Sequence, residues 1–139
     1  MSEEVLFDLP EQVTQAKILC IDDDPCVTDA LARRFRPFDI EVLRAFHGMQ
    51  GLWMAAQERP NAILTDLQMP RGRGDDLIRC LKANPLTANI PVFVITGIHD
   101  AGTASHLVAL GANEVFFKPV EFNHVMEKVC ESLGISLPS

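Results

Sequence analysis

Four short apolar segments of this chain each end in an acid, a hydroxyl or a lysine. The polar residues that end them are Asp22, Asp66, Thr96 and Lys118, and Asp23 follows directly after the first of them. Apolar runs of this length are typical of strands that are covered on both faces of a parallel sheet. Because open parallel sheets bind ligands at the carboxyl ends of their strands, these polar groups are expected to share one edge. Three carboxylates, a hydroxyl and an ammonium group suit a hard divalent cation and a phosphoryl group.

Strands and helices are predicted to alternate along the folded part of the chain. The expected strands are 17–22, 40–46, 61–66, 91–96 and about 114–117. The expected helices begin at Pro25, Gly48 and Asp75 and end before Pro37, Pro60 and Asn84, and two more cover about 103–110 and 121–133. Asp24 is predicted to cap the first helix, since an acid followed by proline is a common helix start. This alternation implies a parallel sheet, right-handed crossovers and helices on both faces of the sheet.

The number of strand–helix units indicates the topology. Five units without a sixth strand predict an α/β, flavodoxin-like sheet with the strand order 2-1-3-4-5. We expect a flexible acidic leader at 1–16, one domain at 17–134 and a short tail at 135–139. In the second helix, Trp53 lies among apolar residues at helical spacing and is predicted to pack in the core.

Charge and cysteine usage exclude several classes of function. The net charge of −7 argues against direct binding of nucleic acid by this domain. No apolar run approaches the roughly 20 residues that a membrane span needs, and the acidic N-terminus carries no signal-peptide pattern. The four cysteines include no Cys-x-x-Cys pair, and free thiols are typical of a reducing cytoplasm.

Four segments of the chain carry motifs at or after the ends of predicted strands. They are the acidic run Asp22-Asp23-Asp24-Pro25, Asp66 with Pro70 and Gly74 after it, Thr96-Gly97, and Lys118-Pro119. In their order and spacing they resemble the receiver domains of two-component response regulators, and this resemblance covers residues 17 to about 134. One such motif alone would be a weak signal, whereas four in this arrangement are a strong one.

The resemblance implies a role for each of these residues. Asp66 would be the nucleophile that takes a phosphoryl group, forming an aspartyl phosphate. The implied ligands of Mg²⁺, or of Mn²⁺ in its place, are Asp22, Asp23, Asp66 and the backbone carbonyl of Gln68. Lys118 would pair with the phosphoryl oxygens, Thr96 would donate a hydrogen bond to them, and Pro119 would follow a cis peptide bond.

The resemblance also implies partners. The phosphoryl donor would be a sensor histidine kinase or a histidine phosphotransfer protein. A downstream effector, or a second copy of the chain, would bind the surface formed by about 103–133. A receiver is not an enzyme with an external substrate, because it catalyses only its own phosphorylation and dephosphorylation.

One position departs from the family pattern. Receivers commonly carry Tyr or Phe three residues before the lysine, and this chain has Val115 there and no Tyr at all. Phe116 is one residue along, so strand alternation directs it to the opposite face of the sheet. The aromatic part of the switch found in receivers is therefore expected to differ in this chain.

Two other classes of function are compatible with part of the sequence. A haloacid-dehalogenase-like phosphatase would use Asp22-x-Asp24, but Asp66 would have no role and no acidic pair follows a strand after Lys118. A pseudo-receiver would dock partners without being phosphorylated, and Val115 is the feature that favours it. Such a protein commonly lacks the acceptor or one of the acids, and this chain has all of them.

Overall fold

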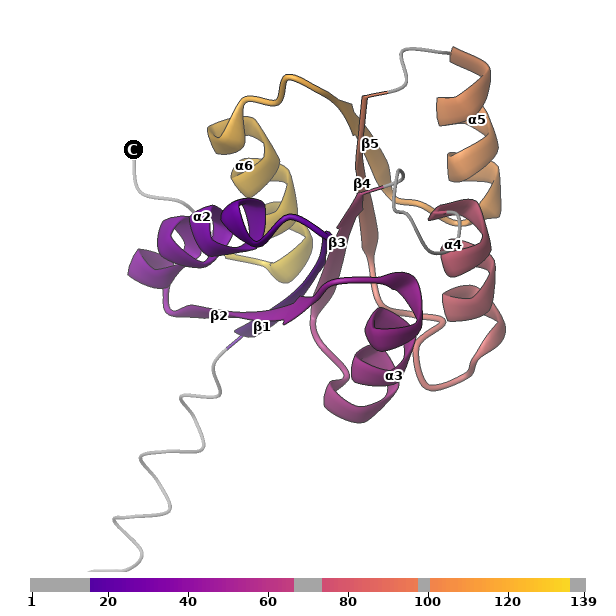
Figure 1. Cartoon of the computed structure of the whole chain (residues 1–139), viewed down its shortest axis with the longest axis horizontal. Helices are drawn as coiled ribbons and strands as arrows, with labels where there is room; N and C mark the ends of the chain where they lie inside the picture. The colour runs from indigo at the N-terminus through magenta and orange to yellow at the C-terminus, as the bar shows by residue number, and fades with distance from the viewer. Residues whose placement is uncertain (1–15, 67–73, 98–100, 136–139) are drawn as a thin grey trace, which may run out of the picture.

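The computed structural model describes residues 16–66, 74–97 and 101–135, and it contains one five-stranded parallel sheet (Figure 1). The strands are β1 (Ala16–Ile21), β2 (Ile40–Ala45), β3 (Ala62–Asp66), β4 (Val92–Thr96) and β5 (Glu114–Phe117). They are arranged in the order β2-β1-β3-β4-β5, and every neighbouring pair is parallel. The predicted strand order is confirmed.

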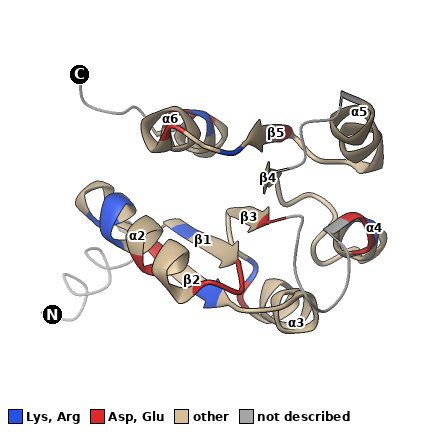
Figure 2. Ribbon diagram, turned by 45° about the horizontal axis from the view of Figure 1, so that its top comes forward, with Lys and Arg blue, Asp and Glu red and all other residues tan. Residues whose placement is uncertain are grey.

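Helices cover both faces of this sheet, as the alternation predicted. They are α2 (Pro25–Phe35), α3 (Gly48–Glu58), α4 (Gly74–Ala83), α5 (Ala101–Leu110) and α6 (Phe122–Leu133), with a short 3₁₀ turn, η1 (Arg36–Phe38), after α2. Figure 2 shows α2 and α6 on one side of the strands and α3, α4 and α5 on the other. The predicted boundaries differ from the observed ones by at most two residues. Pro37 lies inside the 3₁₀ turn rather than directly after the helix.

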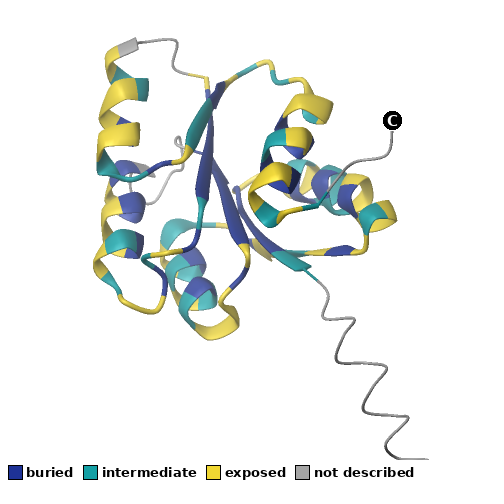
Figure 3. Cartoon of the chain, turned by 180° about the vertical axis from the view of Figure 1, so that it is seen from behind, coloured by how far each residue is buried: buried dark blue, intermediate teal, exposed yellow. Residues whose placement is uncertain are grey.

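The core consists of two apolar layers, one on each face of the sheet. Every residue of β3 and β4 is buried, because helices cover these strands on both sides (Figure 3). Leu31, Phe35 and Val129 lie in the layer beneath α2 and α6, and Ile78, Leu81 and Leu107 lie in the layer beneath α4 and α5. The carboxyl ends of β1, β3 and β4 are therefore fixed by a core on both faces.

The first helix begins as the sequence predicts. Pro25 occupies its first turn, and the Asp24 carboxylate accepts a hydrogen bond of 2.9 Å from the backbone N–H of Cys26. This contact satisfies one of the N–H groups that a helix start leaves without a partner. Asp24 therefore caps the helix. Capping does not explain Asp22 and Asp23, the other two acids of this run.

The prediction that Trp53 packs in the core is wrong. Its side chain is 65% exposed, and that of Met49 on the same helix is 74% exposed. The core-facing side of α3 is formed by Gly51 and Ala55 instead, and a Cβ at Gly51 would lie only 2.5 Å from Cδ1 of Ile21. Small residues allow α3 to approach β1 closely. The 3.6-residue period then directs Met49 and Trp53 away from the sheet.

The predicted leader and tail lie almost entirely outside the described residues. Of the leader at 1–16, only Ala16 is described, and it is the first residue of β1. Of the tail at 135–139, only Ile135 is described. Within the described ranges, no helix combines the length and the apolar character that crossing a membrane requires.

Candidate functional site

Three carboxylates lie together at the carboxyl ends of β1 and β3. Asp66 is the last residue of β3, and Asp22 and Asp23 directly follow β1. One oxygen from each of the three carboxylates lies within 4.8 Å of the other two. Asp22 and Asp66 are buried, at 7% and 6% exposed, whereas Asp23 is exposed. The structure therefore brings together the three acids that the sequence singled out.

Backbone contacts fix the orientation of Asp22. Its N–H donates to the carbonyl of Ala45 at the end of β2, at 2.9 Å, which continues the ladder between β1 and β2. Its carboxylate Oδ1 accepts a hydrogen bond of 2.9 Å from the backbone N–H of Asp24. Asp22 is thus held on one side by the sheet and on the other by the start of α2.

Lys118 directly follows β5 and brings a positive charge to the cluster. Its Nζ lies 3.0 Å from Oδ2 of Asp66, and the side chain of Lys118 is 43% exposed. Its backbone N–H donates to the carbonyl of Thr96 at 2.8 Å, which joins the end of β5 to the end of β4. The peptide bond between Lys118 and Pro119 is cis, as the resemblance implied.

Burial and neighbouring charges shift the pKa values of two groups at the site. The pKa of Asp22 is raised to about 6, mainly by burial, and the neighbouring charges of Asp66 and Asp23 contribute to this rise. The backbone hydrogen bond from Asp24 and the charge of Lys118 only partly oppose it. Partial burial works to lower the pKa of Lys118, but the hydrogen bond and charge of Asp66 outweigh burial, and the net pKa is raised. Burial is therefore the main cause of the shift at Asp22, whereas the neighbouring carboxylates cause the net shift at Lys118.

The donor set fits a hard divalent cation. Carboxylate oxygens are the protein ligands that Mg²⁺ prefers, and Mg²⁺ keeps several waters, so a site with few protein ligands is sufficient. A cation would also relieve the repulsion among three carboxylates. The fourth predicted ligand, the carbonyl of Gln68, lies outside the described residues.

Thr96 is the last residue of β4 and is fully buried. The register pairs Asp66 with Ile95, and Thr96 with Phe117. Thr96 therefore ends its strand at the same edge of the sheet as Asp66 and Lys118. The sequence alone does not identify Phe117 as a neighbour of Thr96, because only the strand register shows that an aromatic residue lies beside it.

The comparison with protein families agrees with this geometry. The model of the family described as "Response regulator receiver domain" matches residues 18–130. The chain belongs to the response regulator receiver family. Receiver domains are phosphoacceptor signalling domains of two-component systems, which bind Mg²⁺ in an acidic pocket and interact with histidine kinases or phosphotransfer proteins. This membership favours the receiver interpretation over the phosphatase alternative.

Individual relatives agree with the family. The chain is 34% identical to the response regulator PleD of Caulobacter vibrioides over 106 residues, which are 76% of this chain and 23% of PleD. It is 28% identical to the transcriptional regulator RpaA of Synechocystis over 113 residues, which are 81% of this chain and 47% of RpaA. The chain therefore spans less than half the length of these two curated relatives.

A solved structure supports the fold directly. A response regulator from Chloroflexus aurantiacus superposes with a TM-score of 0.80 and is 27% identical, covering 87% of this chain and 99% of that one. The five-stranded parallel sheet described above is therefore the receiver fold.

The region around Val115 differs from the aromatic pattern common in receivers. Val115 contributes to the core layer beneath α4 and α5, and Phe116 is buried in the layer on the opposite face. The Phe116 ring stacks on Phe93 at 6.4 Å and meets the ring of His124 edge-on at 5.5 Å. Phe116 is thus fixed in the core. This placement agrees with the expectation that Phe116 lies on the opposite face of the sheet from Val115 and cannot take the place of the aromatic residue common at that position in receivers.

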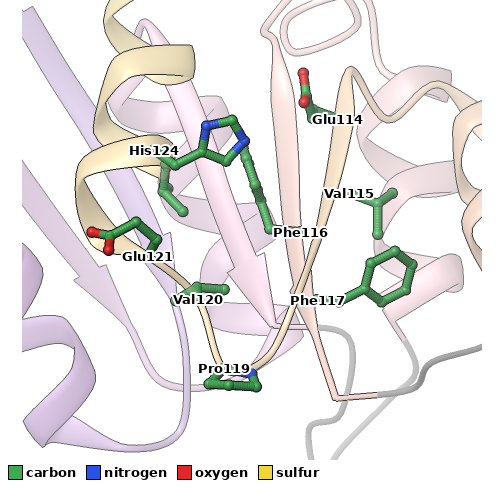
Figure 4. A pocket seen from close by; sticks show the side chains of 9 residues that line it. Glu114, Val115, Phe116, Phe117, Pro119, Val120, Glu121 and His124 are labelled. Carbon is green, nitrogen blue, oxygen red and sulfur yellow. The ribbon is translucent and has the colours of Figure 1, made fainter.

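A cavity of about 390 Å³ lies between β5 and the start of α6 (Figure 4). Phe116, Val120 and Val125 supply apolar walls, and Glu114, Glu121 and His124 supply polar ones. In Figure 4, Val115 and Phe117 point to the opposite side of β5 from His124. The cavity therefore lies beside Pro119 and within the predicted output surface at 103–133.

Proposed function

We propose that Asp66 accepts a phosphoryl group from a phosphohistidine, carried by a sensor histidine kinase or by a histidine phosphotransfer protein. The observation that carries this proposal is the constellation around Asp66. Its carboxylate lies close to those of Asp22 and Asp23, which are suited to a cation, and Nζ of Lys118 lies 3.0 Å from its Oδ2. Arrangements of this kind stabilise the charge of a phosphoryl group during its transfer.

The transfer can be written with a role for each side chain. One carboxylate oxygen of Asp66 attacks phosphorus, the bond from phosphorus to the donor imidazole breaks, and the electron pair returns to the imidazole nitrogen. Lys118 pairs with a phosphoryl oxygen, and the hydroxyl of Thr96 donates a hydrogen bond to another one. Mg²⁺, or Mn²⁺ in its place, would be held by Asp22, Asp23, Asp66 and the carbonyl of Gln68, where it would neutralise charge on the phosphoryl group.

The product of this step is a change in the chain itself, so the chain acts as a signalling switch rather than as an enzyme with an external substrate. We place the receiver domain at 17–134, the leader at 1–16 and the tail at 135–139. Buried and exposed thiols without a disulfide, such as Cys20 and Cys26, support a cytoplasmic location.

The phosphorylated state would be read at the surface formed by about 103–133. This surface contains the cavity beside β5, whose mixed apolar and acidic walls suit an effector protein or a second copy of the chain. With Val115 in place of an aromatic residue, the change would reach this surface from Thr96 through the adjoining loop. Val is short and restricted at χ1, so it offers no large inward and outward positions.

Phosphotransfer from a labelled phosphotransfer protein tests the proposal. The wild-type chain and Asp76→Asn should both take the label, because Asp76 is exposed on α4 and lies outside the carboxylate cluster. The variant Asp66→Asn should take none. If neither protein donors nor small phosphodonors label the wild-type chain, the pseudo-receiver alternative is the correct one.

A further inference from the structure

Helix α3 exposes an apolar face on the outside of the molecule. Met49 is 74% exposed and Trp53 is 65% exposed, and Phe46, just before the helix, is 39% exposed. Met49 and Trp53 are four residues apart and therefore adjacent on one side of the helix. No charged residue occurs between Gly48 and Gln57. In a chain of net charge −7, this is an unusual surface for a helix to present to water.

The core does not account for this composition. On the inward side of α3, Gly51 and Ala55 are buried against the sheet. A helix that is apolar on both sides is generally covered on both sides. The outward face of α3 therefore requires an occupant, and contiguous exposed apolar residues of this kind commonly mark a contact surface.

The chain before β1 contains a segment of matching chemistry. Residues 1–15 are acidic overall, yet Val5, Leu6, Phe7 and Leu9 form a short apolar cluster within them. Such a cluster can bury its side chains only against another apolar surface.

The point at which this segment joins the fold lies beside α3. Lys17, the second residue of β1, contacts Glu58, the last residue of α3, with 3.4 Å between Nζ and Oε1. The backbone carbonyl of Lys17 also accepts a hydrogen bond of 2.8 Å from the N–H of Asn61, just after the helix. The start of β1 and the C-terminal end of α3 are therefore neighbours.

The segment is long enough to reach the exposed face. Trp53 lies five residues before Glu58, which is about 8 Å along the helix axis at 1.5 Å per residue. The chain from Leu9 to Ala16 can extend over roughly 20 Å. We propose that residues 5–9 pack on the outward face of α3, against Met49 and Trp53.

Charge favours this occupant over a second copy of the chain. The segment carries Glu3, Glu4, Asp8 and Glu11, and the outward face of α3 is a surface without acids that would repel them. Two copies meeting through α3 would instead bring together two molecules of net charge −7. A segment joined to the same fold also acts at a high effective concentration, without the entropy loss of association between two molecules.

The fluorescence of Trp53 reports on this contact, because it is the single tryptophan of the chain. The experiment compares the full chain with Leu6→Ser/Phe7→Ser, measuring the emission maximum and quenching by acrylamide. If residues 5–9 cover about half of the exposed indole surface, the acrylamide quenching constant of the wild type should be roughly half that of the variant. The variant should emit at longer wavelength. The matched control Glu3→Gln/Glu4→Gln, which changes the same segment but keeps its apolar cluster, should behave as the wild type.

Two outcomes would overturn the proposal. Equal quenching in the wild type and Leu6→Ser/Phe7→Ser would show that the segment does not cover Trp53. Quenching that depends on protein concentration in both of these chains would show that a second copy covers α3. In support, a synthetic peptide of residues 1–15 added to the double variant should restore the protection of Trp53. None of these readouts depends on phosphorylation, so they test this contact independently of the role of Asp66.

Discussion

The ammonium nitrogen of Lys118 lies 3.0 Å from Oδ2 of Asp66, although Asp66 ends β3, Lys118 directly follows β5, and β4 lies between these two strands. Their contact crosses the edge of the sheet at the point where the carboxyl ends of the strands meet. Lys118 places a positive charge next to an otherwise acidic cluster. In the function proposed above, the same ammonium group would pair with a phosphoryl group on Asp66.

Removing this charge should strengthen metal binding. Lys118→Ala leaves three carboxylates without their neighbouring ammonium group, so the site attracts a divalent cation more strongly. We expect the Kd for Mg²⁺, measured by calorimetric titration, to fall by roughly three- to tenfold. The control Lys128→Ala makes the same change of net charge on α6. A similar fall in that variant would show that only the overall charge matters.

Magnesium should stabilise the folded chain through the same cluster. A cation that binds only the native state raises the melting temperature by mass action. Thermal unfolding with increasing MgCl₂ should show this rise in the wild type and should show none in Asp23→Ala. A full rise in Asp23→Ala would place the metal site elsewhere, and NaCl at equal ionic strength is the control for screening.

The metal-free chain should gain stability when Asp22 loses its charge. The pKa of Asp22 is about 6 in the folded state against 3.8 for the unperturbed group, so its ionisation destabilises the fold above pH 6 and has no effect below about 3.8. Asp22→Asn keeps the oxygen that accepts from the N–H of Asp24. We expect a gain on the order of 2 kcal/mol near neutral pH, measured by urea unfolding in EDTA.

The gain from Asp22→Asn should shrink as the pH falls from 6 towards 4, because the wild-type carboxyl then takes up a proton in the folded state, while the carboxyl of the unfolded chain, with a pKa of 3.8, is still largely ionised. A gain that stays constant between pH 4 and pH 7 would show that ionisation of Asp22 is not its cause.

The sequence predicted the sheet because its signals are local. The apolar runs ending in Asp22, Asp66 and Thr96 identify three strand ends, and the rule for parallel sheets then places those ends at one edge. The cluster of carboxylates followed from strand order alone, without any knowledge of side-chain packing.

The features that the sequence did not predict depend on tertiary contacts. Trp53 was placed in the core because α3 is apolar on both sides, and only the close approach of Gly51 to Ile21 shows which side faces the sheet. The proximity of Phe117 to Thr96 depends on the register between β4 and β5, and the sequence of neither strand determines that register. Small residues such as Gly51 and Ala55 were the available signal for the orientation of α3.

Phosphorylation should alter the loop after β4 more than it alters β5. We expect beryllofluoride, which mimics a phosphoryl group on Asp66, to give strong protection from amide exchange at 96–102 and small changes at 113–117. The reason is that Thr96 would be drawn to the bound group, whereas Val115 has no large alternative positions. The reverse pattern would show that an aromatic residue in β5 has taken over the switch. Phe117 is then the residue to mutate, because it pairs with Thr96, whereas Phe116 is fixed in the core.

The central claim is that Asp66 is the single phosphoacceptor of this chain. Intact mass spectrometry after incubation with phosphoramidate or acetyl phosphate and Mg²⁺ tests it most directly. The account predicts one added phosphoryl mass on the wild-type chain, its loss when EDTA replaces Mg²⁺, and no added mass on Asp66→Asn. A phosphoryl mass that persists on Asp66→Asn would contradict the account.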